Sequence, residues 1–267
     1  MRRRDWLAGG GALVGAAVLA GCATQPPLRG TADLGIVIER ESGSVLIIDT
    51  TARRVLTRVE GFGDLSHASA VFSRDARHAY VFGRDGALTK LDLLTARIVG
   101  RVQQAGNSIG GAISADGRLV AAQNYAPGGV KVFDAQTLAQ VADIPAEMGG
   151  GVAGGKASRV VGLVDLPGSR FSYSLFDADA IWIADLSETV ANGAAPRITK
   201  LEGIGKQPYD ALVTPDGRHY IAGLFGEDGL AMVDLWAEPL KVRRILGGYG
   251  RGQQPLPVYK MPHLRGW

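Results

Sequence analysis

A short phrase that recurs along the chain constrains its fold more than any other feature. In its clearest copy, at 110–122, an apolar run reaches Ser114, breaks at Asp116-Gly117 and then resumes. Two apolar runs separated by Asp-Gly are typical of a β-hairpin. Related copies lie at 70–77, around 164–168 and at 211–218. The sequence therefore predicts a series of similar hairpins.

A second phrase, an apolar run that ends in aspartate, accompanies each hairpin. The aspartates are separated by 43, 42, 51 and 49 residues, and they are Asp49, Asp92, Asp134, Asp185 and Asp234. Self-similarity at this period, with several short strands and no helical pattern between them, indicates a β-propeller in which each repeat is a four-stranded blade. The predicted fold class is therefore all-β.

The strand pattern predicts about five blades. The first blade has strands at 34–40, 44–50 and 54–60 and lacks its innermost strand. Four complete blades follow, with inner strands near 69–73, 110–114, 159–164 and 210–214. Residues 254–262 would close a five-bladed ring, but their three prolines make them poor members of a hydrogen-bonded ladder. The favoured interpretation is a propeller that is incomplete at its C-terminus, and a closed five-bladed ring is the alternative.

The N-terminus predicts export. Three arginines precede an apolar run at 7–20 that is too short for a transmembrane helix, and residues 19–22, LAGC, resemble the lipobox of bacterial lipoproteins. We expect a signal peptide at 1–21, a lipidated Cys22 with a linker to residue 33, and the propeller at 34–267. The leader also resembles a twin-arginine signal. An ordinary signal peptide with a chance cysteine is the alternative.

These features predict a periplasmic protein that is anchored to a membrane by lipid. Ala23 stands where an aspartate would favour retention in the inner membrane, so the outer membrane is the expected location. The leader supplies most of the formal net charge of +3, and the rest of the chain gives no case for nucleic-acid binding. The single cysteine excludes an internal disulfide framework and any multi-cysteine metal site.

Two motif matches lack the structural context that their chemistry needs. Residues 106–110 fit the G-x-S-x-G pattern of serine hydrolases, but they lead into a strand instead of a helix. Residues 150–156 resemble a phosphate-binding loop, but Ala157 stands where Ser or Thr would hold Mg²⁺. The four histidines have no close-spaced pair, so a structural zinc site is not expected.

The loops before the inner strands are the expected functional end of the propeller. They place polar candidates at the mouth of the central channel: His67, Lys206, Tyr209, Arg251 and His263. The two histidines are either ligands or acid–base groups, or else ordinary loop residues. The two cations either bind carboxylates of an anionic ligand or are simply solvated.

The other two histidines belong to the opposite end of the propeller. His78 and His219 each follow the turn of a repeated hairpin. We therefore interpret them as residues that stabilise the turns or lie partly exposed beside them.

The order of several motifs resembles the NirF family of haem d1 biosynthesis proteins from denitrifying bacteria. The motifs are the leader, the S-x-D-G-R hairpins, GKQPYD at 205–210 and KMPHLRGW at 260–267. NirF is similar in turn to the haem d1 domain of nitrite reductase, an eight-bladed propeller. Members of the family continue for several blades beyond the last motif, so the resemblance also implies a truncated chain.

The resemblance implies a late function in haem d1 biosynthesis. The protein would bind haem d1 or its dihydro precursor and dehydrogenate a propionate side chain to an acrylate, as an oxidoreductase. His67 and His263 would carry this chemistry, either of them as an iron ligand, and Lys206, Tyr209 and Arg251 would bind the macrocycle. Other Nir proteins and nitrite reductase are the implied partners.

Two non-catalytic functions remain as alternatives. The first is a haem d1 carrier, or a propeller that scaffolds other biosynthetic proteins. It would bind the macrocycle without forming the acrylate. The second is an outer-membrane assembly propeller that presents flat surfaces to membrane proteins, and it would bind no pigment.

Overall fold

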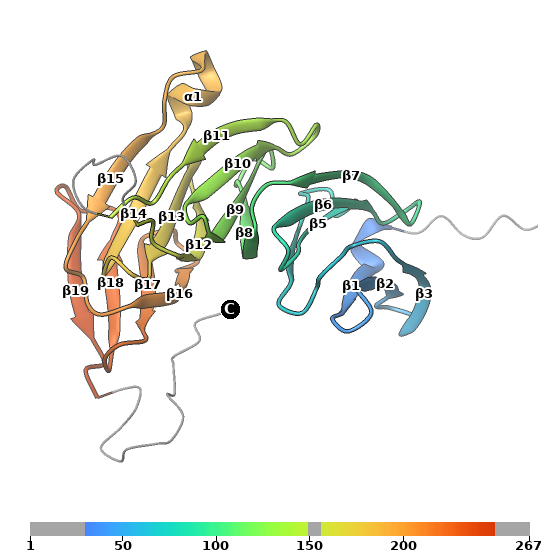
Figure 1. The fold of residues 1–267 in the computed structure, drawn as a ribbon, viewed down its shortest axis with the longest axis horizontal. Helices are drawn as coiled ribbons and strands as arrows, with labels where there is room; N and C mark the ends of the chain where they lie inside the picture. Colours follow the sequence, from blue (N-terminus) through green and yellow to red (C-terminus); the bar gives the residue numbers. More distant parts are fainter. Residues whose placement is uncertain (1–29, 149–155, 249–267) are drawn as a thin grey trace, which may run out of the picture.

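The computed structural model describes residues 30–148 and 156–248, which form five antiparallel sheets in an arc (Figure 1). The first sheet follows a short 3-10 helix at Thr31–Asp33 and has three strands, in the order β1-β2-β3. Their bounds are Leu34–Glu39, Ser44–Asp49 and Arg54–Val59. The expected three-stranded first blade is therefore confirmed.

Each of the next four sheets has four strands that pair in sequence order. The second blade contains β4 (Ser69–Phe72), β5 (His78–Phe82), β6 (Ala87–Asp92) and β7 (Arg97–Gln103). The third contains β8 (Asn107–Ile113), β9 (Leu119–Ala126), β10 (Val130–Asp134) and β11 (Gln140–Ile144). The fourth contains β12 (Val160–Leu166), β13 (Arg170–Leu175), β14 (Ala180–Asp185) and β15 (Arg197–Leu201). The fifth contains β16 (Pro208–Val213), β17 (His219–Leu224), β18 (Leu230–Asp234) and β19 (Lys241–Ile245).

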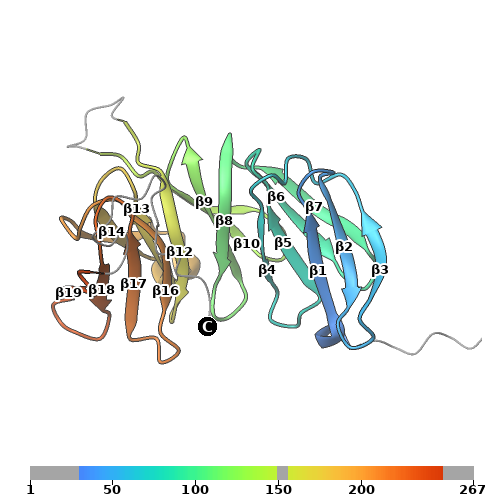
Figure 2. The ribbon, with the colours of Figure 1, turned by 90° about the horizontal axis from the view of Figure 1, so that it is seen from below.

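The first strand of each complete blade lies on the concave side of the arc. Figure 2 shows β4, β8, β12 and β16 along this side, and these are the inner strands predicted from the sequence. The apolar cores lie between neighbouring sheets, and the largest of them joins the third and fourth blades through Phe171, Tyr173 and Leu175. Strands with an apolar residue on each face bury both faces in this way. The all-β blade architecture is confirmed.

The repeated hairpin phrase has a structural explanation. Ser114 Oγ lies 2.6 Å from Asp116 Oδ1 and accepts the backbone N–H of Leu119 at 3.0 Å. The equivalent bonds occur at Ser73 and at Thr214. Short polar side chains of this kind hold a tight turn by bonding to the backbone. The phrase therefore recurs because each blade needs the same turn between its first two strands.

The repeated aspartate closes the turn between the third and fourth strands. Asp92 Oδ1 accepts hydrogen bonds from the backbone N–H groups of Leu94 and Thr95. The aspartates of the other four blades accept equivalent backbone hydrogen bonds, and they are Asp49, Asp134, Asp185 and Asp234. In the second blade, Arg77 also donates to Asp92 Oδ2 at 2.8 Å and so joins the two turns. Both repeated phrases lie at the end of the blades opposite to the start of the inner strands.

One short helix departs from the expected pattern. Residues Ser187–Asn192 form α1 between β14 and β15, where no helix was predicted. Asp185 Oδ1 accepts the backbone N–H of Ser187 at the helix start, and Gly193 ends the helix with a φ of 77°. A helix of six residues, less than two turns, is too short to display a 3.6-residue period in the sequence.

The inner strands are bulged near their starting ends. In the fourth blade, Gly162 and Leu163 lie opposite the single residue Tyr173, and in the fifth, Tyr209 and Asp210 lie opposite Gly223. A bulge redirects side chains out of the regular alternation of a strand. Gly162 has a φ of +59°, and a Cβ built there would lie 2.4 Å from the backbone oxygen of Tyr209. Only glycine allows β12 and β16 to approach so closely.

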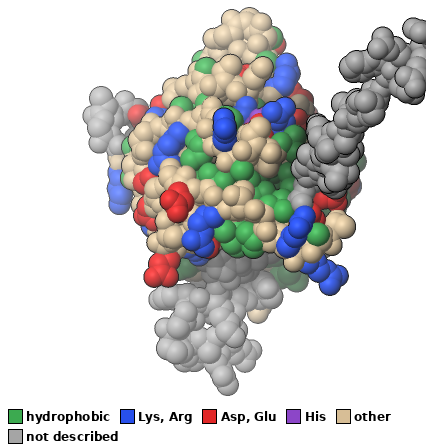
Figure 3. All heavy atoms as spheres, turned by 90° about the vertical axis from the view of Figure 1, so that its right-hand side faces the viewer, with side chains coloured by type: hydrophobic (Ala, Val, Ile, Leu, Met, Phe, Trp, Pro, Cys, Tyr) green, Lys and Arg blue, Asp and Glu red, His purple; other side chains and the backbone are tan. Residues whose placement is uncertain are grey.

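The first sheet exposes apolar side chains at the side of the molecule shown in Figure 3, where they lie between Lys and Arg side chains. Val37 of β1 and Val55 of β3 are 45% and 56% exposed. Within the described residues, β1 pairs only with β2.

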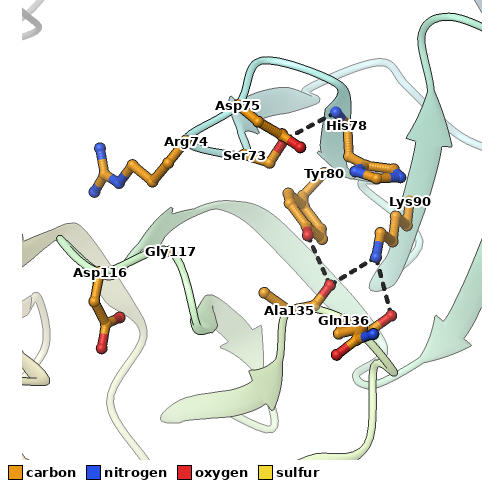
Figure 4. A pocket seen from close by; sticks show the side chains of 10 residues that line it. All are labelled: Ser73, Arg74, Asp75, His78, Tyr80, Lys90, Asp116, Gly117, Ala135 and Gln136. Atoms are coloured by element: carbon orange, nitrogen blue, oxygen red, sulfur yellow. Dashed lines mark hydrogen bonds between the residues drawn. The ribbon is translucent and has the colours of Figure 1, made fainter.

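A buried lysine ties the second blade to the third. Figure 4 shows Lys90 Nζ donating to the backbone oxygens of Ala135 and Gln136, at 2.9 Å each. Every other blade has an apolar residue two positions before its aspartate, at Ile47, Val132, Ile183 and Met232. His78 lies beside Lys90 and lines the same cavity of about 320 Å³.

His78 is expected to make folding stability depend on pH. Burial lowers the pKa of His78 below its ordinary value of 6.5, and the nearby Lys90 lowers it further. The unfolded chain then binds more protons, so this contribution is complete above the ordinary pKa and is lost as the pH falls below it. His78→Leu introduces the residue that the third blade has at the equivalent position, Leu119. This variant should flatten the dependence of folding stability on pH between about pH 7 and pH 5. Denaturant unfolding at several pH values measures it, and an unchanged slope would contradict the expectation.

Candidate functional site

Six side chains gather at the end of the blades where the inner strands begin, and we call them the mouth cluster. They are Arg84, Tyr125, Arg159, Phe176, Tyr209 and Phe225. They come from four different blades. The cluster therefore depends on the arrangement of the blades around the arc.

Four of the six side chains occupy one position of the repeat. In each blade, one residue of the second strand pairs with the repeated aspartate: His78, Leu119, Arg170 and His219. The sixth residue after each of these is Arg84, Tyr125, Phe176 and Phe225. This place is the end of the second strand or the loop after it, and all such loops of a propeller lie at one end. The same position in the first blade is Arg40.

Three aromatic rings pack against one another in the cluster. The ring of Phe176 lies 5.6 Å from those of both Tyr209 and Phe225, at interplanar angles of 79° and 64°. Tyr209 and Phe225 lie 6.0 Å apart. Edge-to-face packing of this kind is favourable and leaves ring faces directed elsewhere. Tyr209 and Phe225 are both partly exposed.

Two guanidinium groups lie over the rings. Arg159 lies 4.3 Å from the centre of the Phe176 ring and 5.8 Å from that of Tyr125, and Arg84 lies 5.5 Å from that of Tyr125. Arg159 Nη2 also contacts Asp177 Oδ1 at 2.6 Å, and the hydrogen bonds from this side chain lower the pKa of Asp177. A guanidinium over a ring is well placed to bind an anion from the solvent side.

A hydrogen bond between two phenols joins the cluster across the arc. Tyr125 Oη lies 2.5 Å from Tyr209 Oη. Burial raises the pKa of Tyr125, and the hydrogen bond with Tyr209 raises it further. Tyr125 is therefore a neutral hydrogen-bonding group at physiological pH.

The inner strands enclose a cavity of about 440 Å³ along the concave side of the arc. Small residues line much of it, including Ser69, Gly110 and Gly162, together with the buried Asp210. Asp210 follows Tyr209 in the bulge of β16. The bulge thus joins the mouth cluster to the cavity.

Of the three predicted site residues that the structure describes, one lies in the mouth cluster. Tyr209 belongs to it, and Lys206 is exposed in the loop just before β16. His67 is exposed in the loop before β4, and blades three and four separate it from Tyr209. Arg251, His263 and the lipidation site Cys22 lie outside the described residues, so their assignments stay predictions.

The discounted motifs have structural roles where they are described. Ser108, the serine of the G-x-S-x-G match, is buried in β8, and its hydroxyl donates to the backbone oxygen of Gln123 at 2.7 Å. The phosphate-loop match at 150–156 lies almost wholly outside the described residues. Within the described ranges, no group of three His, Cys, Asp or Glu residues could hold a metal ion, and no helix is long and apolar enough to span a membrane.

Sequence reasoning missed Arg84, Tyr125, Arg159, Phe176 and Phe225. Four of them could have been found by aligning the blades on the residue paired with the repeated aspartate, as described above. This position shows no obvious motif in the sequence, because it holds different residue types in different blades.

Comparison with known protein families shows to which family the chain belongs. The profile described as Cytochrome D1 heme domain matches residues 29–267. The chain belongs to the Cytochrome D1 heme domain family. Protein NirF of Pseudomonas aeruginosa is 66% identical over 250 residues, which are 94% of this chain and 62% of that protein. The resemblance to NirF is therefore confirmed, and the chain spans less than two thirds of this relative.

Two solved structures extend the comparison. Dihydro-heme d1 dehydrogenase NirN in complex with DHE is 28% identical, with a TM-score of 0.70 over 87% of this chain and 48% of that chain. The β-propeller domain of Myceliophteria thermophila Cps50 (Swd1) has a TM-score of 0.60 at 12% identity, over 81% of this chain and 72% of that chain. The second likeness concerns the fold alone, and it agrees with the propeller predicted from the repeats.

Proposed function

We propose that this protein binds a haem d1 precursor at the mouth cluster and acts late in haem d1 biosynthesis. The reaction would be the dehydrogenation of a propionate side chain to an acrylate, which removes two protons and two electrons and requires an external electron acceptor. The membership of the Cytochrome D1 heme domain family and the similarity to NirN support a tetrapyrrole ligand.

The mouth cluster is the observation that carries this proposal. A macrocycle with carboxylate side chains presents a flat π face and negative groups at its edge. Partly exposed aromatic rings, including Tyr209 and Phe225, provide surface for the face, and the guanidiniums of Arg84 and Arg159 provide donors for the carboxylates. The six side chains therefore match both parts of the ligand.

The sequence candidates supply the remaining roles in the proposal. Lys206 and Arg251 would bind further carboxylates, and Tyr209 would pack against the macrocycle. His67 or His263 would ligate the iron or move a proton, because a neutral imidazole can do either. Cys22 would anchor the protein to the outer membrane, facing the periplasm, where other Nir proteins and nitrite reductase would be its partners.

Pigment binding tests the proposal directly. Titration of the purified full chain with dihydro-haem d1 should give a saturable change in the visible absorption spectrum, and no change would refute it. Mass spectrometry after incubation with an electron acceptor then distinguishes an enzyme from a carrier. An enzyme removes two hydrogen atoms from the pigment, whereas a carrier returns it unchanged.

The histidine assignments need their own variants. His67→Ala combined with His263→Ala should change the spectrum of the bound pigment, because one of the two is the proposed iron ligand or proton-transfer group. His219→Ala, at the opposite end of the blades, is the matched control and should leave the spectrum unchanged. A double variant with the spectrum of the unaltered protein would remove both histidines from the site.

A further inference from the structure

A pair of buried side-chain amides lies behind the mouth cluster. Gln104 Nε2 donates to Asn124 Oδ1 at 2.9 Å, and Asn124 Nδ2 donates to Gln104 Oε1 at 2.9 Å. Gln104 is 6% exposed and Asn124 is fully buried. The two residues thus satisfy each other away from water, in a reciprocal arrangement that fixes the orientation of both amides.

Asn124 differs in chemical type from its equivalents in the fourth and fifth blades. Asn124 directly precedes Tyr125, and the equivalent residues of the fourth and fifth blades are Leu175 and Leu224, both buried. Leucine therefore fits this position of the repeat and would cost no desolvation of polar groups. A buried amide is expensive unless it is fully paired, so its presence here is better explained by orientation than by stability.

The pair connects the two parts of the cluster that carry Tyr125 and Arg84. The backbone N–H of Gln104 donates to Gly86 O at 3.1 Å, in the loop that carries Arg84. The backbone N–H of Ser108 also donates to Arg84 O. On the other side, Asn124 is the last paired residue before the bulge that frees Tyr125 from the ladder between β8 and β9.

We infer that Gln104 and Asn124 are positioning residues of the tetrapyrrole site, which hold the Tyr125 ring and the Arg84 guanidinium in the arrangement that binds the ligand. This inference rests on the proposed function. Tyr125 leaves the regular ladder, so the strand alone does not fix its direction. The amide pair supplies the missing constraint, and it links that constraint to the loop of Arg84.

The test compares variants that are expected to fold but differ in whether residues 104 and 124 form a hydrogen-bonded amide pair. Gln104→Leu with Asn124→Leu replaces both amides by leucine, which the fourth and fifth blades have at the position of Asn124, so no buried polar group is left alone. Exchange of the two residues, Gln104→Asn with Asn124→Gln, keeps a complementary amide pair. Gln104→Met is a further variant of similar volume without the pairing. Thermal unfolding verifies that each variant is folded.

Dihydro-haem d1 is the probe, and its dissociation constant and bound spectrum are the readouts. The double leucine variant should have an unfolding temperature close to that of the unaltered protein. It should bind dihydro-haem d1 about 10-fold to 100-fold more weakly and with an altered spectrum, which is the usual effect of removing a residue that orients a binding group. The exchanged pair should recover most of the affinity. A folded double leucine variant with unchanged affinity and spectrum would overturn the inference.

Failure of the proposed function is recognised separately, because the unaltered protein would then bind no pigment. Hydrogen exchange of the Gln104 and Ala105 amides, which both donate to Gly86 O, provides a readout that needs no ligand. These amides should exchange faster in the double leucine variant and in Gln104→Met. Unchanged exchange in both variants would show that the amide pair does not hold the loop of Arg84.

Discussion

Arg159→Gln should weaken dihydro-haem d1 binding by about 10-fold to 100-fold, because a charge-assisted hydrogen bond to a ligand carboxylate is worth roughly 1.5–3 kcal/mol. Arg159 lies 4.3 Å from the Phe176 ring, and Asp177 fixes the direction of its guanidinium. Glutamine keeps a hydrogen-bond donor, but it is shorter and lacks the charge and the two-pronged geometry of the guanidinium. The dissociation constant is measured by absorption titration.

The stability of this variant should change little, which separates the effect on binding from unfolding. The Arg159 side chain is 43% exposed, and exposed ion pairs contribute about 0–1 kcal/mol. Arg197→Gln is the matched control, because Arg197 contacts Asp185 at 2.6 Å at the opposite end of the blade. Equal affinity losses in the two variants would indicate a general charge effect and contradict a specific role for Arg159.

Gly162→Ala should destabilise the protein by roughly 2–4 kcal/mol, from backbone strain together with overpacking. The φ of Gly162 is +59°, and an added Cβ would lie 2.4 Å from Tyr209 O and 3.0 Å from Ala211 Cβ. The backbone oxygen cannot rotate away as a flexible side chain would, so β12 and β16 must separate. Denaturant unfolding measures the loss. We also expect weaker pigment binding, because the same movement displaces Tyr209.

Gly168→Ala separates the two causes of this loss. Gly168 has a φ of +81° in the turn between β12 and β13, but nothing lies within 4 Å of an added Cβ. This variant should therefore show only the strain, about 1–2 kcal/mol, and normal pigment binding. If Gly162→Ala were no more destabilising than Gly168→Ala, the contact between the two inner strands would not be the constraint that we describe.

The number and order of the strands were predictable because their causes are local. Alternating apolar residues, a Ser or Thr two positions before Asp, and an aspartate at the end of the third strand each act within a few residues. These patterns located all the inner strands and the three-stranded first blade. The same patterns did not predict α1, whose six residues are too few to leave a periodic pattern.

The site was predicted only in part. Loop position pointed to the end of the blades where the mouth cluster lies, and it included Tyr209, which belongs to this cluster. Chemical type pointed to two histidines, Lys206, Tyr209 and Arg251, whereas the cluster is built from four aromatic rings and two other arginines. Arg84 and Phe176 are ordinary residues in the sequence, and they become a site only through their common position in neighbouring blades.

By itself, the sequence determined the all-β repeat, the turns that hold each blade, and the likeness to NirF, since each of these follows from short stretches of residues. Only the tertiary structure decided that Tyr125 meets Tyr209 across the arc and that Arg84 and Arg159 share the Tyr125 ring. The physical reason is that the bulges of β9 and β16 and the packing of neighbouring blades set these contacts. Both depend on how whole sheets pack, and no single stretch of sequence encodes them.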